Sequence, residues 1–267
     1  MRLTWEDMRG ISFPGRSTDG RQETGMIVYA PDYYSRFHCI ADRCRHTCCE
    51  GWEIDIDPVT LNMYGAVDGP LGEKLKRSIC LDPEPHFVLC PGERCPFLTD
   101  TNLCELILEK GEGMLCQICR DHPRFRNYWS DRVELGLGMV CEESARLILS
   151  SDHPLRLVPV GEDEGEEAEE PDDEEIFLRE QRDQLLSVSD YTGPAARLRE
   201  YLIYRHMADA LYDGLWEERL RFVNMTCETL LSTWDGRDIA QLAERCRAFS
   251  NEVEYDDEKL GNMICGS

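Results

Sequence analysis

The residues most able to do chemistry in this chain are cysteines that occur in groups with short spacings. Nine of the fourteen cysteines form these groups: Cys39, Cys44, Cys48, Cys49, Cys95, Cys104, Cys116, Cys119 and Cys141. Thiolates are soft ligands, and grouped thiolates commonly hold zinc, copper(I) or iron–sulfur clusters. The pattern therefore predicts a metal centre, with all nine as candidate ligands.

A disulfide framework is the alternative use of so many cysteines, and the sequence disfavours it. Residues 1–7 contain no charged region followed by an apolar stretch, so no secretory signal is visible. A chain of 267 residues can bury a hydrophobic core large enough to fold without disulfide bonds. No apolar run approaches the roughly 18 residues that a membrane span needs. We therefore expect a reduced, cytoplasmic, metal-binding protein.

The spacings leave the identity of the metal open. Four-sulfur zinc sites usually have two Cys-x2-Cys pairs about 15–20 residues apart, and only Cys116 and Cys119 form such a pair. The ferredoxin spacing is absent. The three-cysteine spacing of radical S-adenosylmethionine enzymes fails because Gly51 stands at the third position. A thioredoxin-like role for the pair would need a βαβ context, which the neighbouring sequence does not offer.

Charge limits the partners. The formal net charge is −24, from 53 acidic and 29 basic residues, and eleven of the acids lie in residues 162–175. Such a run has no apolar periodicity and predicts a solvated, self-repelling linker. Nucleic acid and anionic membrane surfaces are excluded as partners, because the chain lacks the basic surface that binds phosphates.

The elements around the cysteines predict a mainly α protein in three parts. Residues 1–155 read as an irregular, metal-organised, Cys-rich region, residues 156–175 as the acidic linker, and residues 176–267 as a helical bundle. In the first part, Asp57-Pro58 opens a helix, and further helices are expected over 103–110 and 142–150.

The third part has clearer helical signals. We expect helices over 176–187, from Gly193-Pro194 to Tyr212, over 216–231, and after a capping residue at Asp238. Cys227 and Cys246 fall within these helices and are expected to be buried rather than ligands.

The order of the motifs resembles a known family. The succession is PDYYSRFHCIADRCRHTCCEGWEIDID (31–57), CPFL (95–98), LCEL (103–106), LCQICRDHPR (115–124) and CEESARL (141–147), with YLIYRHMADALYDG (201–214) and FSNEVEYDDEKLGNM (249–263) further on. It is similar to the flagellin lysine N-methylase family, and more loosely to short cysteine-cluster proteins. That family is expected to continue for many residues beyond Asn262.

The resemblance implies an S-adenosylmethionine-dependent transfer of methyl groups to lysines of flagellin, in an enzyme with a 4Fe–4S cluster. It implies that the grouped cysteines hold that cluster, with zinc as the alternative metal. The acceptor amine must lose a proton, and Glu134 and Glu142 are our candidates to accept it. Arg124 is our candidate for binding a cofactor carboxylate. The alternative function is a non-enzymatic zinc- or iron-binding module.

Overall fold

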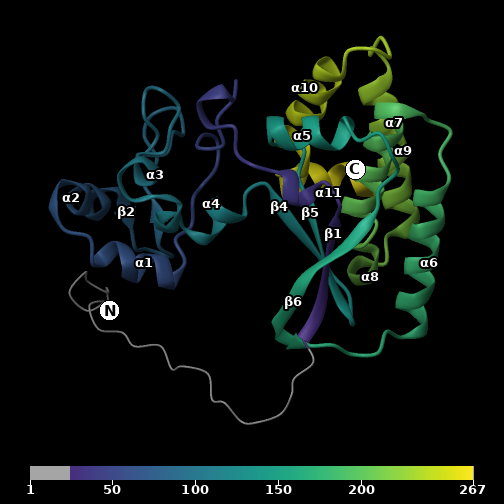
Figure 1. Ribbon diagram of the computed structural model, residues 1–267, viewed down its shortest axis with the longest axis horizontal. Helices are drawn as coiled ribbons and strands as arrows, with labels where there is room; N and C mark the ends of the chain where they lie inside the picture. The colour runs from purple at the N-terminus through teal and green to yellow at the C-terminus, as the bar shows by residue number, and fades with distance from the viewer. Residues whose placement is uncertain (1–24, 267) are drawn as a thin grey trace. The chain divides into compact units, whose positions relative to one another are not determined.

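The computed structural model describes residues 25–266, which form two compact units (Figure 1). The Cys-rich unit comprises residues 40–122, and the sheet unit comprises residues 25–39 and 123–266. The Cys-rich unit is therefore an insertion in the sequence of the sheet unit. We describe each unit by itself.

The Cys-rich unit is built from short elements. They are η2 (Ala41–Arg43), α1 (Pro58–Gly65), α2 (Gly69–Ser78), β2 (Ile79–Cys80), β3 (His86–Phe87), α3 (Glu105–Lys110), η3 (Glu112–Met114) and α4 (Gln117–Asp121). β2 and β3 form a two-stranded antiparallel sheet. Tyr64, Leu75, Phe87 and Phe97 are fully buried at the centre of its core.

One carboxylate begins two of these helices. Asp57 accepts a hydrogen bond from the backbone N–H of Thr60 (2.9 Å), which caps α1, and Pro58 occupies the first helical position. Its second oxygen accepts from the N–H of Gln117 (2.8 Å), the first residue of α4. Partial burial opposes ionisation of Asp57, but these N–H donors lower its pKa below the usual value. The predicted helix start at Asp57-Pro58 is confirmed.

The sheet unit contains a four-stranded mixed sheet. Its strands are β1 (Gly25–Pro31), β4 (Arg124–Tyr128), β5 (Arg132–Leu137) and β6 (Leu157–Glu167), in the order β4-β5-β1-β6. β1 and β5 are parallel, with Ile27 opposite Arg132, whereas β4 and β6 run antiparallel to their neighbours. The carboxyl ends of β1 and β5 therefore lie at the same edge of the sheet.

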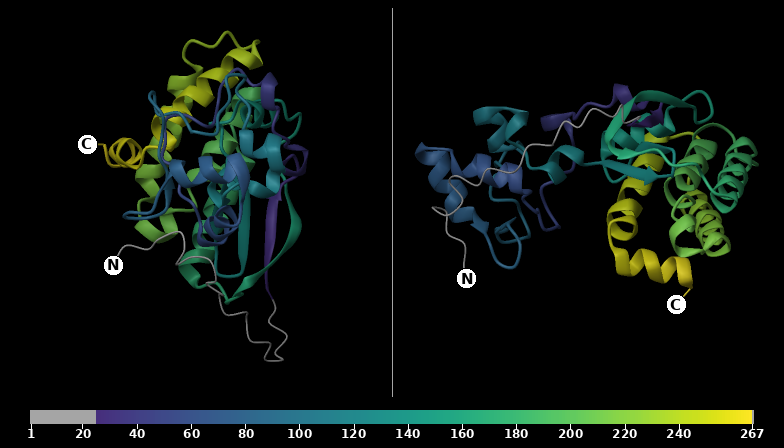
Figure 2. Two further views of the ribbon diagram at one scale, coloured as in Figure 1. Left: turned by 90° about the vertical axis from the view of Figure 1, so that its left-hand side faces the viewer. Right: turned by 90° about the horizontal axis from the view of Figure 1, so that it is seen from below.

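The rest of the sheet unit consists of helices and the loops that join them, seen from two further sides in Figure 2. They are η1 (Tyr34–Arg36), α5 (Glu142–Leu149), α6 (Asp173–Ser187), α7 (Gly193–His206), α8 (Ala210–Asp213), α9 (Trp216–Leu231), α10 (Ile239–Phe249), the π-helix η4 (Ser250–Glu254) and α11 (Asp257–Cys265). Their core includes Leu137, Leu198, Phe222 and the buried thiols Cys227 and Cys246. No helix in residues 25–266 is both long enough and apolar enough to cross a bilayer.

The predicted fold class is right for the helices and incomplete overall, because the sheet was missed. The predicted acidic linker at 156–175 is wrong over much of its length. Residues 157–167 form β6, which pairs with β1, and Asp172 caps α6 by accepting from the N–H of Glu175. An edge strand tolerates charged side chains, because only its backbone must be paired. The unit boundaries also differ from the predicted ones, since residues 123–155 fold with the C-terminal half.

Candidate functional site

Several of the predicted ligand thiols meet in the core of the Cys-rich unit. Cys95 and Cys116 are buried, and Cys49, Cys104 and Cys119 pack against the same core. Of these, Cys116 and Cys119 approach most closely, with 3.4 Å between their sulfur atoms. Cys116 immediately precedes α4, so the Asp57 bond to Gln117 helps to position this pair. We call these five residues the thiol group.

Backbone N–H groups point at three sulfurs of the thiol group. Cys104 accepts from Ile107 and Leu106 at the start of α3, Cys95 accepts from Phe97, and Cys116 accepts from Cys119. Hydrogen bonds to sulfur favour the thiolate, which is the form that binds metals. The local backbone therefore favours negative charge where ligands are expected.

Burial acts in the opposite direction on the same thiols. It raises the pKa of Cys95 to about 11, although the bond from the Phe97 N–H opposes this. The hydrogen bond between the Cys116 and Cys119 sulfurs lowers the pKa of Cys116 and raises that of Cys119.

A tyrosine hydroxyl lies among these thiols. Tyr64 is completely buried and donates to the carbonyl of Met114 (2.7 Å). Burial, followed by the negative charge of Cys116 and Cys119, raises its pKa well above the usual value. Cys104 and Cys95 contribute in the same direction, so four thiols lie within electrostatic reach of one hydroxyl.

The donor set fits a thiolate-bound metal. Tetrahedral zinc at about 2.3 Å from each sulfur separates its ligands by about 3.8 Å, close to the Cys116–Cys119 distance. Within residues 25–266, no three His, Cys, Asp or Glu side chains lie close enough together to hold an ion as placed. Cys116 and Cys119 are therefore the pair of the thiol group whose spacing suits two ligands of one ion.

The other predicted ligands are outside the thiol group as defined, although Cys48 borders it. Cys39 and Cys141 belong to the sheet unit, where Cys141 immediately precedes α5. Cys44 and Cys48 belong to the Cys-rich unit, and Cys48 lies beside Cys49 and within electrostatic reach of Cys104. Cys90, which lacks the grouped spacing, lies within electrostatic reach of Cys95.

The three predicted catalytic and cofactor residues are all in the sheet unit, at separate places. Glu134 is 1% exposed on β5, and both of its carboxylate oxygens accept from Arg182 of α6 (2.7 and 2.8 Å). Glu142 is half-buried in the first turn of α5. Arg124 begins β4 and lies over the rings of Tyr34 and Phe37, 5.7 and 5.3 Å from their centroids.

Sequence reasoning missed a polar cluster beyond the carboxyl end of β5. Glu254, on the π-helix, accepts from the Tyr201 hydroxyl (2.9 Å), lies 2.7 Å from Nε2 of His206, and forms an ion pair with Arg205 (3.2 Å). The Tyr201 hydroxyl in turn accepts from the N–H of Met139 (3.1 Å). π-Helical segments are frequent at functional sites. The signal was available, because these residues lie within the motifs over 201–214 and 249–263.

Tyr255 extends this cluster to the surface. The residue is 47% exposed, yet its hydroxyl lies beside Gly138. A Cβ at Gly138 would be 2.7 Å from that hydroxyl and 3.3 Å from Nη1 of Arg205. A side chain at Gly138 would therefore displace Tyr255.

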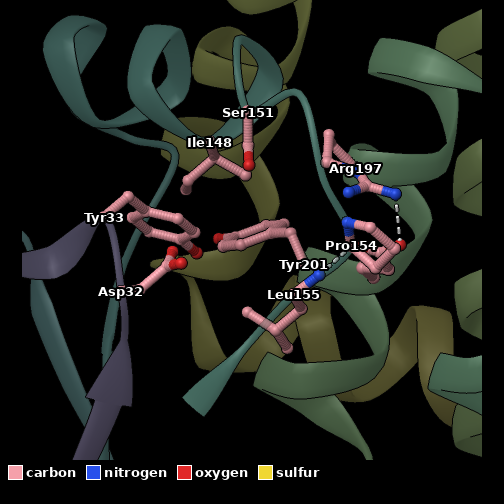
Figure 3. Close-up of a pocket in the computed structure, with 9 residues that line it drawn as sticks. Asp32, Tyr33, Ile148, Ser151, Pro154, Leu155, Arg197 and Tyr201 are labelled. Carbon is pink, nitrogen blue, oxygen red and sulfur yellow. Dashed lines mark hydrogen bonds and ion pairs between the residues drawn. The ribbon is translucent and has the colours of Figure 1, made fainter. Parts of the chain in front are cut away.

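The cluster borders a small cavity at the carboxyl end of β1. Asp32, Tyr33 and Tyr201 gather on one side of it and Arg197 lies on another (Figure 3). Its volume is about 10 Å³, which is room for one water molecule. Asp32 Oδ1 and the Nε and Nη1 of Arg197 are buried without a protein partner. A bound water would satisfy such atoms.

No family model matches this chain, and no solved structure matches it. Three curated proteins are similar to it. The lysine-N-methylases of Salmonella typhimurium and Salmonella choleraesuis are 28% and 27% identical over 146 aligned residues, covering 49% of this chain and 35% of each relative.

The flagellar biosynthetic protein FliU of Salmonella muenchen is 26% identical over 139 aligned residues, covering 49% of this chain and 82% of that protein. The chain thus spans about a third of the length of the two methylases. Over about half of its own length, it is a distant homologue of the Salmonella lysine-N-methylases and of FliU.

Proposed function

We propose that this protein is an S-adenosylmethionine-dependent lysine N-methyltransferase and that flagellin is its substrate. The single observation that carries this proposal is the relationship to proteins named lysine-N-methylase and FliU. The order of the motifs in the sequence agrees with it.

The reaction defines what the residues must do. The lone pair of the lysine amine attacks the methyl carbon of the sulfonium, the carbon–sulfur bond breaks, and its electron pair stays on sulfur. The ammonium must first give its proton to a base. S-adenosylmethionine supplies the methyl group, and S-adenosylhomocysteine is left.

We place this chemistry at the polar cluster beyond β5. Ligands of open sheets bind beyond the carboxyl ends of parallel strands, and β1 and β5 are the parallel pair here. Tyr255 is accessible there and has its hydroxyl beside Arg205. Glu142 remains our candidate for the base, because it is half-buried in the first turn of α5. We do not place Glu134 in this role.

We further propose that the thiol group holds a metal, with a 4Fe–4S cluster as the first choice and zinc as the alternative. The second candidate function is a metal-binding module without enzyme activity. The observation that favours it is that the thiol group lies in a compact unit of its own.

The test combines methyl transfer with metal content. Protein purified without oxygen is incubated with flagellin and methyl-labelled S-adenosylmethionine, and N-methyllysine is detected by mass spectrometry. Iron, sulfide and zinc are measured in the wild type, Cys116→Ser, Cys119→Ser and the control Cys265→Ser, whose exposed thiol lies on α11. We expect N-methyllysine with the wild type, and metal loss in the first two variants alone. A metal-loaded wild type that leaves flagellin unmethylated would support the binding module.

A further inference from the structure

The helices of the sheet unit enclose a groove that the proposed reaction does not use. It has a volume of about 820 Å³ and lies between α6, the turn after it, α7 and α9. These helices run beside one another in Figure 1. We define the groove by its lining residues: Gln181, Gln184, Leu185, Val188, Ser189, Asp190, Tyr191, Arg199, Trp216, Glu217, Leu220, Asn224 and Glu228.

The groove has an apolar floor with aromatic rings. Leu185, Tyr191, Trp216 and Leu220 are partly buried against the main core. Val188, in the turn after α6, is 63% exposed. A floor of this kind can cover the methylene chain of a long side chain, while an indole or phenol ring attracts a cation at its face.

The charge of the groove is negative. Three carboxylates line it, Asp190, Glu217 and Glu228, against the single guanidinium of Arg199, so the lining carries a net charge of −2. Asp190, Glu217 and Glu228 are all exposed. Carboxylates beside a low-dielectric wall attract cations and speed their association.

The guanidinium of Arg199, which is the one positively charged group of the lining, donates hydrogen bonds to backbone carbonyls. Nη1 of Arg199 donates to the carbonyls of Leu185 (2.8 Å) and Val188 (3.0 Å), which holds the turn after α6 against α7. Glu228 and Asp190 both lie close enough to Tyr191 to raise the pKa of its hydroxyl, after burial. Tyr191, Asp190 and Glu228 therefore lie near one another in the lining of the groove.

We propose that this groove docks a lysine-bearing segment of the protein substrate, with a lysine ammonium group held beside Glu217 and the Trp216 ring at the start of α9. The charge and the apolar floor both match a lysine side chain. The identity of the substrate rests on the proposed function, whereas the chemistry of the occupant rests on the groove itself.

The first experiment tests the chemistry without methyl transfer. The probe is a short peptide with one lysine flanked by alanines, and its counterpart carries norleucine instead. Binding is followed by the NMR signal of the Trp216 indole N–H, assigned with Trp216→Phe. We expect the lysine peptide alone to shift this signal. Equal shifts with both peptides, or none, would overturn the groove proposal whatever flagellin does.

The second experiment tests the substrate. The groove variant is Asp190→Asn, Glu217→Gln and Glu228→Gln, and the matched control is Glu170→Gln, Glu180→Gln and Glu258→Gln, three exposed carboxylates outside the groove. We expect KM for flagellin to rise about tenfold in the groove variant, with kcat and S-adenosylmethionine binding unchanged.

Equal behaviour of the two triple variants would overturn the groove proposal and leave methyl transfer intact. A wild type that methylates no flagellin but still binds the lysine peptide would overturn the proposed function. The groove proposal would then still stand.

Discussion

Arg182 of α6 donates to both carboxylate oxygens of Glu134 on β5, at 2.7 and 2.8 Å, and both side chains are buried. The guanidinium also lies over the ring of Trp129, 4.8 Å from its centroid. This pair fastens a helix to a central strand of the sheet. The ion pair gives Glu134 a structural role in joining α6 to the sheet.

We therefore predict that Glu134→Gln destabilises the protein by about 3–5 kcal/mol, because it leaves the Arg182 charge buried and unpaired. Denaturant unfolding measures this. Replacing both partners, with Glu134→Leu and Arg182→Met, is expected to recover part of the loss. A Glu134→Gln protein of native stability that transfers no methyl groups would restore Glu134 as the base.

A second prediction concerns the carboxylate that begins two helices. Asp57→Ala removes the acceptor for the N–H groups of both Thr60 and Gln117. We expect a loss of about 1–2 kcal/mol for each cap, and weaker metal retention, because the start of α4, which lies between Cys116 and Cys119, is no longer held to residue 57. Metal content during dialysis against a chelator gives the readout.

Asp238→Ala is the matched control, since that residue caps α10 in the sheet unit. It should cost similar stability and leave the metal in place. Equal metal retention in both variants would show that Asp57 does not position the thiol pair.

A third prediction concerns how the stability of the protein depends on pH through the buried carboxylate of Glu254. Burial opposes ionisation of Glu254, but the charge of Arg205 and the His206 contact outweigh it and lower its pKa from 4.5 to about 2. A carboxyl group whose pKa is lowered on folding stabilises the native state above its unfolded pKa, and this stabilisation is lost as the pH falls. For Glu254 the loss runs from about pH 4.5 down to about pH 2.

The difference in free energy of unfolding between the wild type and Glu254→Gln should therefore be largest above pH 5 and shrink toward pH 2. Urea unfolding at a series of pH values measures it. A difference that stays constant over this range would show that Glu254 does not ionise as the network implies.

Local signals made the helices predictable. Asp57-Pro58 and Asp238 are caps that the sequence shows directly, and both helices begin where expected. The helix expected to continue to Tyr212 instead ends at His206, and α8 follows. The sheet could not be predicted in this way, because Ile27 pairs with Arg132, and the whole inserted unit lies between these two residues in the sequence. β6 was hidden by its charge, since its acidic residues lack the apolar alternation of a half-buried strand.

The candidate sites also contain some residues whose proximity could be predicted from the sequence and others whose proximity could not. Cys116 and Cys119 share one turn of chain, so their spacing predicted their proximity. Cys141 has an equally suggestive motif, yet it belongs to the other unit. Tyr201 and Glu254 come from separate helices, and only tertiary packing brings their oxygens to 2.9 Å.

The last prediction tests the proposed site of methyl transfer by adding a methyl group at Gly138, where there is little room beside the Tyr255 hydroxyl. In Gly138→Ala, the new Cβ would lie 2.7 Å from the Tyr255 hydroxyl and 3.2 Å from the carbonyl of Pro123. The Tyr255 side chain must move, while the helices behind it can stay. Because misplacement by about 1 Å can cost up to a hundredfold in rate, we expect kcat with flagellin to fall at least tenfold. Circular dichroism should show an unchanged fold.

Gly161→Ala is the matched control, because a Cβ at that position of β6 meets nothing within 4 Å. Tyr255→Phe combined with Gly138→Ala removes the clashing hydroxyl and should relieve the strain on stability. It should not restore the rate if that hydroxyl takes part in methyl transfer. Full activity of Gly138→Ala would place the reaction elsewhere in the molecule, since no catalytic arrangement around Tyr255 can survive its displacement.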